Sequence, residues 1–234
     1  MKADVLLIVF AIQGWSEAGS WKNSLLAGLF ERIPGVKVVV PDYMNGTGKF
    51  AKFKSHLRIE QYAARVRSVY KQTEKAYPSV PILVVGHSLG GLVARYLYNE
   101  GLFYSKNMIL AGTPNKGVSY KMFGGEFGRI VLPILKVLAR KSICNVPVFY
   151  QLLEGSDFLK ELNEGGIPRN AHYIRGCFDT VVEAESSDPY GIGTVINCDH
   201  HMFPRKKEEM DSVKNSAIPV IMRIVGERLR EMKP

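Results

Sequence analysis

The stretch Gly86-His87-Ser88-Leu89-Gly90 follows the apolar run 82–85 (ILVV) and opens the segment Leu89 to Asn99. The run predicts a buried strand, and the segment behind it has the length and composition of a helix. A G-x-S-x-G sequence at such a junction is typical of a sharp turn that holds its serine in a strained conformation between small residues. In a simpler alternative, Ser88 only caps the helix. The flanking strand and helix favour Ser88 as a nucleophile.

Apolar runs of strand length alternate with helical patterns along most of the chain. This alternation predicts an α/β fold with a mostly parallel sheet of about six strands and helices on both faces. The expected strands are Val5–Phe10, Val36–Val40, Ile82–Val85, Asn107–Ala111, Tyr173–Gly176 and Thr194–Asn197. The expected helices are Trp21–Arg32, Arg58–Ala76, Leu89–Asn99 and a closing helix from near Ser216 to near Met232 with Pro219 in its first turn. A chain of 234 residues can bury a full core as a single domain, which we predict over residues 1–234.

The segment around residues 118–170 interrupts the alternation of strands and helices. It contains an apolar stripe with helical spacing, interrupted by Pro133, that consists of Phe127, Ile130, Val131, Ile134, Leu135 and Leu138. Because the segment follows a strand that ends at the expected active edge, we interpret it as a cap over the site. An ordinary packed helix pair without a gating role is an equal alternative.

The chain carries a formal net charge of +9. We interpret this charge as a solvated surface and predict no nucleic-acid partner, because no nucleic-acid module or aromatic-interleaved basic motif accompanies it. Peripheral contact with an anionic membrane surface stays open. No apolar stretch approaches the ~20 residues of a membrane-spanning helix. The run Val5 to Ile12 has the length of a signal-peptide core, but Asp4 adjoins it and no cleavage site follows, so a cytoplasmic location is expected.

A serine hydroxyl needs a base, and the base needs an acid that orients it. His172, His200 and His201 are the histidines that follow Ser88 in the sequence. His172 precedes a predicted strand and therefore belongs to the opposite edge of the sheet, whereas His200 and His201 follow the last strand. One of these two is the candidate base.

The acid is expected after the penultimate strand, where Asp179 lies. Asp188 and Asp199 are its rivals. Asp188 lies deep in a loop beside Pro189, where an aspartate usually stabilises a turn, and Asp199 is too close along the backbone to orient the histidine easily. We therefore favour Asp179.

Two donors are needed to stabilise an oxyanion on the acyl carbon. The backbone N–H of Leu89 lies at a helix N-terminus directly after the candidate nucleophile. The second donor is expected in the loop Gln13-Gly14-Trp15 after the first strand, and we select the N–H of Trp15. A simple turn is the alternative interpretation of this loop.

These motifs together resemble the α/β-hydrolase superfamily, and in particular its lipase-like branch of triacylglycerol lipases and GPI-inositol-deacylase-like serine esterases. The resemblance covers nearly the whole chain. Its motifs are the elbow 86–91 (GHSLGG), the turn 112–117 (GTPNKG), the segment 155–163 (GSDFLKELN), the acid-bearing turn 179–182 (DTVV) and the pair Asp199-His200. The last match favours His200 over His201 as the base. The chain departs from the family at Gln13-Gly14, where His-Gly is usual, which removes any inference about the substrate.

We therefore predict a serine hydrolase that cleaves carboxylic esters of small molecules or lipids through an acyl-enzyme on Ser88. His200 is the base and Asp179 the acid. No metal or organic cofactor is implied, because no metal-ligand spacing or dinucleotide fingerprint is present. An acyltransferase with the same triad and a catalytically silent binding protein are the alternatives. The sequence does not decide the oligomeric state.

Overall fold

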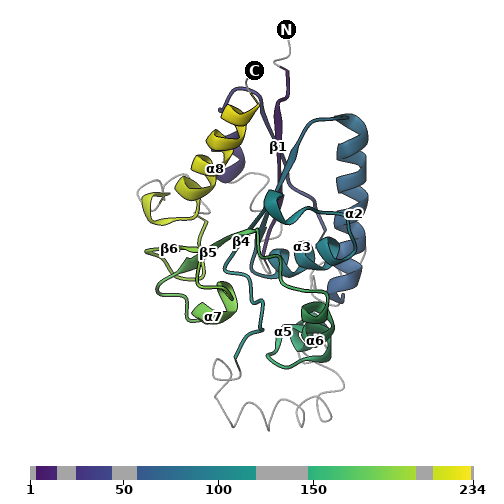
Figure 1. Ribbon diagram of the computed structural model, residues 1–234, viewed down its shortest axis with the longest axis vertical. Coiled ribbons are helices and arrows are strands. Elements are labelled where there is room, and N and C mark those ends of the chain that lie inside the picture. Colours follow the sequence, from purple (N-terminus) through teal and green to yellow (C-terminus); the bar gives the residue numbers. More distant parts are fainter. Residues whose placement is uncertain (1–3, 15–24, 44–56, 120–146, 204–212, 233–234) are drawn as a thin grey trace, which may run out of the picture.

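The centre of the molecule is a six-stranded sheet in which all neighbouring strands are parallel, in the order β2-β1-β3-β4-β5-β6 (Figure 1). The computed structural model describes residues 4–14, 25–43, 57–119, 147–203 and 213–232. The strands are β1 (Leu7–Ile12), β2 (Val36–Val39), β3 (Ile82–His87), β4 (Met108–Ala111), β5 (His172–Gly176) and β6 (Thr194–Ile196). The helices are α1 (Leu25–Phe30), α2 (Ile59–Ala76), α3 (Leu89–Asn99), the 3-10 helix η2 (Ser105–Asn107), α5 (Pro147–Leu152), α6 (Asp157–Glu164), α7 (Ala184–Ser187) and α8 (Ile218–Glu231).

The predicted fold class, a mostly parallel sheet with helices on both faces, is confirmed. The main differences from the predicted elements are at β1 and β3. β1 begins and ends two residues later than predicted, because Ile8 to Ile12 pair with Ile82 to Gly86 of β3. β3 in turn extends through Gly86 and His87, which pair with Leu110 and Ala111. A glycine and a histidine do not continue an apolar run, so the apolar pattern ends before the strand does.

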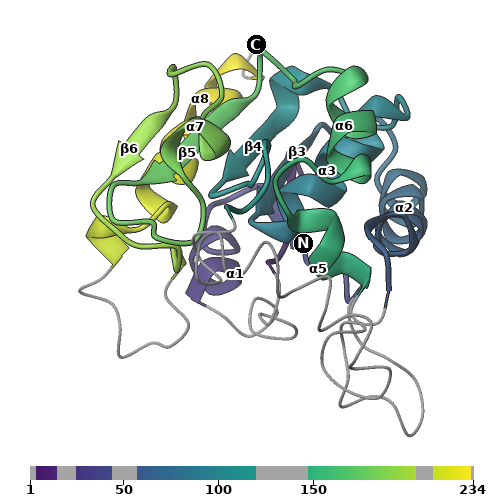
Figure 2. The same ribbon diagram turned by 90° about the horizontal axis from the view of Figure 1, so that it is seen from below.

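The connections explain which face each helix covers. The chain passes from β1 through α1 to β2, then returns through α2 to β3 on the other side of β1, and continues through α3 to β4. Since parallel crossovers are right-handed, reversing the direction of travel moves the connecting helices to the opposite face. Figures 1 and 2 accordingly show α8 on one side of the sheet and α2 and α3 on the other.

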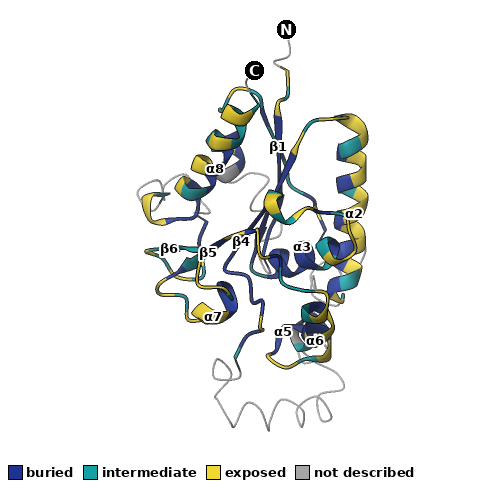
Figure 3. Cartoon of the chain, in the orientation of Figure 1, coloured by how far each residue is buried: buried dark blue, intermediate teal, exposed yellow. Residues whose placement is uncertain are grey.

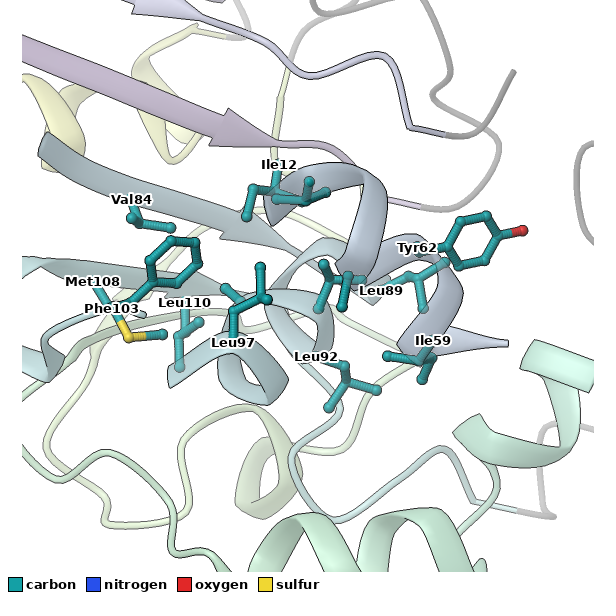
Figure 4. Packing of buried hydrophobic residues seen from close by; sticks show 14 of the residues in the cluster. Ile12, Ile59, Tyr62, Val84, Leu89, Leu92, Leu97, Phe103, Met108 and Leu110 are labelled. Carbon is teal, nitrogen blue, oxygen red and sulfur yellow. The ribbon is translucent and has the colours of Figure 1, made fainter. Parts of the chain in front are cut away.

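Alternation along β1 divides the core between these two faces. Ile8, Phe10 and Ile12 pack with α2, α3, α5 and α6, whereas Leu7, Val9 and Ala11 pack with α1 and α8. All six residues are buried, as expected for a central parallel strand that is covered on both sides (Figure 3). Figure 4 shows the first cluster, in which labelled side chains of α2 and α3 meet those of β1, β3 and β4.

The described part of the predicted cap, residues 118–119 and 147–170, contains α5 and α6. Val148, Phe158 and Leu162 join the cluster on the α3 side of the sheet. The apolar stripe from Phe127 to Leu138 lies outside the described residues, so the cap stays a prediction. Within the described ranges, no helix combines the length and the apolar character needed to cross a membrane.

The fully buried side chain of Arg95 connects α3 to this region. Its guanidinium donates hydrogen bonds of 2.8–3.5 Å to the carbonyls of Asn115, Leu162 and Gly166 and to the side-chain oxygens of Asn115 and Asn163. Among the described residues no carboxylate forms an ion pair with it, and burial lowers the pKa of Arg95 to about 10. Leu162 and Asn163 are in the last turn of α6, so the negative end of that helix offsets part of the positive charge.

Replacing Arg95 with methionine is expected to lower the free energy of unfolding by about 3 kcal/mol, because several buried carbonyl groups would lose their donor. For a chain of this length the midpoint of thermal unfolding should fall by about 6–12 °C. A matched control is Arg67→Met. Arg67 forms an ion pair with Glu100 at the surface. Surface pairs contribute about 0–1 kcal/mol, so equal losses for the two variants would contradict the prediction.

Candidate active site

The carboxyl ends of β1 and β3 lie side by side at the point where the strand order changes direction. The connection after β1 leads to β2 on one side of β1, and the connection after β2 leads back to β3 on its other side. In open parallel sheets, ligands bind at the carboxyl ends of the strands where the order reverses in this way. Gln13 and Gly14 follow β1, and Ser88 follows β3. The sheet therefore brings the predicted oxyanion loop and the predicted nucleophile to adjacent positions.

Ser88 occupies a sharp turn between β3 and α3. Its φ of 51° and ψ of −121° are unusual for a residue with a side chain, which fits the strain expected at this position. Glycine is required around the turn by close backbone approach. A Cβ at Gly86 would lie 2.7 Å from Cα of Gly91, and a Cβ at Gly90 would lie 2.1 Å from the carbonyl oxygen of Ile12. The G-x-S-x-G spacing thus allows α3 to pack directly against β3 and the end of β1.

The structure brings Ser88, His200 and Asp179 together in one hydrogen-bonded chain. Nε2 of His200 lies 2.9 Å from Oγ of Ser88, and Nδ1 of His200 lies 2.8 Å from Oδ2 of Asp179. The side chain of Asp179 is 1% exposed and that of His200 is 13% exposed, so water has little access to the inner bond. A carboxylate only accepts, so Nδ1 donates and Nε2 is left to accept the proton of Ser88.

Asp179 is held in place from its other side. Its Oδ1 accepts hydrogen bonds from the backbone N–H groups of Val181 and Val182, both at 2.9 Å. These two donors fix the carboxylate in the orientation that presents Oδ2 to His200. Burial of the charge is offset by the three hydrogen bonds that it accepts.

The rival residues of the sequence analysis lie elsewhere. Asp188 accepts hydrogen bonds from the backbone of Ile192 and Gly193 and so stabilises its own loop. The exposed Asp199 accepts from the N–H of its neighbour His201, which is itself exposed. His172 begins β5, at the opposite edge of the sheet from Ser88.

On the oxyanion side, the described residues hold one of the two predicted donors. Leu89 is the first residue of α3, and the N–H groups of a first helical turn have no partner within their own helix. Trp15 lies outside the described residues, so its N–H stays a prediction. The preceding loop is fixed by Tyr43, whose buried hydroxyl donates a hydrogen bond to the carbonyl of Gln13. Because the Gln13 carbonyl and the Gly14 N–H belong to one peptide plane, Tyr43 also fixes the orientation of that N–H.

Comparison with solved structures finds the same fold in several hydrolases of low sequence identity. A metagenome-derived lipolytic enzyme matches with a TM-score of 0.63 and 14% identity over 98% of this chain and 95% of that chain. Monoglyceride lipase from Saccharomyces cerevisiae matches with a TM-score of 0.62 and 14% identity over 96% of this chain and 87% of that chain. A carboxyl esterase from Bacillus coagulans matches with a TM-score of 0.56 and 16% identity over 95% and 91% of the two chains. The chain has the α/β-hydrolase fold. No family model matches the sequence, and no curated protein is significantly similar to it.

Sequence reasoning missed two residues that this α/β-hydrolase fold places against the site. Tyr43 follows β2, and only the sheet order shows that the end of β2 adjoins the end of β1. His87 precedes Ser88, and its Nε2 lies 2.9 Å from the carbonyl oxygen of His200. The strand alternation indicated only the face of His87, which is the face of Leu83 and Val85, and not its partner His200.

The described residues give less support to a metal site or to a cysteine nucleophile. They contain no group of three or more His, Cys, Asp or Glu side chains that could hold a metal ion. Cys198 is near the site, but burial and the nearby carboxylates of Asp199 and Asp179 raise its pKa to about 12. That thiol stays protonated near neutral pH and is therefore a poor nucleophile beside Ser88.

Proposed function

We propose that this protein is a serine hydrolase of carboxylic esters that works through an acyl-enzyme on Ser88. The observation that carries the proposal is the continuous hydrogen-bonded chain from Ser88 through His200 to the buried Asp179. Support of a different kind comes from the solved neighbours, which are described as a lipolytic enzyme, a monoglyceride lipase, a carboxyl esterase and a type II thioesterase.

The geometry supports a two-step reaction. Oγ of Ser88 attacks the acyl carbon while Nε2 of His200 removes its proton, and Asp179 stabilises the resulting imidazolium. The oxyanion that forms is stabilised by the N–H of Leu89 and, in our proposal, the N–H of Trp15. His200 then donates its proton to the leaving alcohol. In the second step His200 removes a proton from water, which attacks the acyl carbon. His200 then returns this proton to Oγ of Ser88 as the bond between Oγ and the acyl carbon breaks, which releases the acid and restores the free enzyme.

In our proposal the apolar stripe from Phe127 to Leu138, which lies outside the described residues, either lines or covers an apolar acyl pocket above Ser88. If that stripe borders the acyl chain, each additional CH₂ should contribute about 0.8 kcal/mol, or nearly fourfold in kcat/KM, until the pocket is filled. Initial rates on p-nitrophenyl esters with roughly two to eight acyl carbons measure this dependence. Highest kcat/KM on the acetate would show that the stripe is ordinary core and that the substrate is short.

The same assay tests the proposed function itself. Hydrolysis of at least one ester in the series, with the free acid as product, is the expected result. Transfer of the acyl group to an added alcohol without acid formation would indicate an acyltransferase with the same triad. Complete failure to turn over the series and to react with a fluorophosphonate would contradict the proposal and favour a catalytically silent protein.

A further inference from the structure

His87 connects the candidate nucleophile to the backbone of the candidate base. The residue is 2% exposed, and its ring lies between β3 and the loop that follows β6. A carbonyl oxygen only accepts, so Nε2 of His87 must carry a proton and donate it to the carbonyl of His200 at 2.9 Å. The same carbonyl also accepts the N–H of Met202 at 3.0 Å. His87 therefore bonds to the main chain of the residue whose side chain contacts Ser88.

Ring contacts add to this hydrogen bond. The centroids of the His87 and His200 rings are 5.2 Å apart with an interplanar angle of 36°, so the two imidazoles lie partly against each other. His87 also meets the ring of Phe203 edge to face, with the ring centroids again 5.2 Å apart. The His87 ring thus lies between β3, the strand that precedes Ser88, and residues 200–203.

We infer that His87 is a positioning residue that sets the distance between Nε2 of His200 and Oγ of Ser88. Three contacts then determine how His200 lies: its carbonyl bonds to His87, its Nδ1 to Asp179 and its Nε2 to Ser88. His87 and Ser88 are adjacent in the chain. The same short segment of backbone therefore holds both the nucleophile and, through the hydrogen bond of His87, the base His200. Proton transfer depends on that distance, and a misplacement of about 1 Å can cost about a hundredfold in rate.

This inference rests on the proposed function and is tested by two variants that separate the hydrogen bond from the ring. His87→Phe keeps a ring against His200 and Phe203 but removes the donor. His87→Gln removes the ring but keeps an N–H donor at about the reach of Nε2. We expect His87→Phe to lower kcat for p-nitrophenyl esters by about tenfold to a hundredfold with KM little changed. His87→Gln should recover most of that loss.

If His87 had a purely structural role, its substitution would lower the midpoint of thermal unfolding, but kcat would not fall in His87→Phe and recover in His87→Gln. His201→Gln is the matched control, because it makes the same exchange at the neighbouring exposed histidine, and it should leave kcat unchanged. Equal kcat for His87→Phe and the wild type, or equal losses in the Phe and Gln variants, would overturn the inference. If His87→Phe does not fold, His87→Asn, whose amide ends short of the carbonyl, replaces it in the comparison with His87→Gln.

The outcome also separates this inference from the proposed function. Ester turnover that depends on Ser88 but not on the donor at position 87 would leave the proposed function standing and remove the role of His87. A wild-type protein that neither hydrolyses esters nor reacts with a fluorophosphonate would remove both. The rate of fluorophosphonate labelling provides the same comparison between variants without ester turnover, because it also requires His200 to activate Ser88.

Discussion

Replacing Ser88 with alanine is expected to lower kcat/KM for ester hydrolysis by about 10⁴-fold or more and to abolish labelling by a fluorophosphonate. The hydroxyl is the group that attacks, and no other described side chain is hydrogen-bonded to Nε2 of His200. The fold should survive the change, because Oγ of Ser88 does not cap α3 and its hydrogen bond is made to the side chain of His200. Steady-state rates, labelling with mass analysis and circular dichroism measure the three effects.

Ser79 provides a matched control for this substitution. It is the other described residue with a side chain and a positive φ, at 67°, and it lies in the exposed turn before β3. Ser79→Ala makes the same chemical change at another residue with positive φ, at the opposite edge of the sheet, so kcat/KM should not change. If the Ser88→Ala protein reacted with the fluorophosphonate at the full rate, another residue would be the nucleophile and the assignment of Ser88 would be wrong.

Most of the fold was predictable because it depends on local patterns. The strand, turn and helix around Ser88 combine an apolar run, small residues at fixed spacing and a helical segment, and the observed helix has the predicted bounds Leu89–Asn99. The closing helix also has Pro219 in its first turn, as predicted. The bounds of β1 were displaced because strand ends are set by pairing with neighbours, which no single segment encodes.

The site was predictable where topology constrains it and not where packing does. The order of serine, acid and histidine along a parallel sheet was enough to select Asp179 and the pair His200 and His201 as candidates, since carboxyl ends of parallel strands meet at one edge. The preference for His200 within that pair came from the family resemblance. By contrast, the contacts of Tyr43 with Gln13 and of His87 with His200 join residues that are 30 and 113 positions apart. Local sequence carries no signal for such pairs, because the strand order and the packing of loops decide which partners meet.

Replacing Asp179 with asparagine should lower kcat/KM by about 10³–10⁴-fold at neutral pH while leaving the fold intact. The reason lies in the two N–H groups of Val181 and Val182, which point at Oδ1. They require an oxygen there, so the new NH₂ group must face His200. An NH₂ donor makes Nδ1 of His200 the acceptor and moves its proton to Nε2, where it points at Ser88 and prevents removal of the serine proton.

Asp188→Asn is the matched control for this change. Asp188 is also a buried carboxylate that accepts two backbone N–H groups, from Ile192 and Gly193, but each of its oxygens accepts one of them. Its asparagine variant must place NH₂ against one donor and should lose about 1–3 kcal/mol of stability with kcat/KM unchanged. The two variants should therefore have opposite effects. Asp179→Asn should lose activity and keep its stability, whereas Asp188→Asn should lose stability and keep its activity. Loss of activity at position 188 instead would assign the orienting acid to Asp188, and rates measured beside unfolding midpoints distinguish the two assignments.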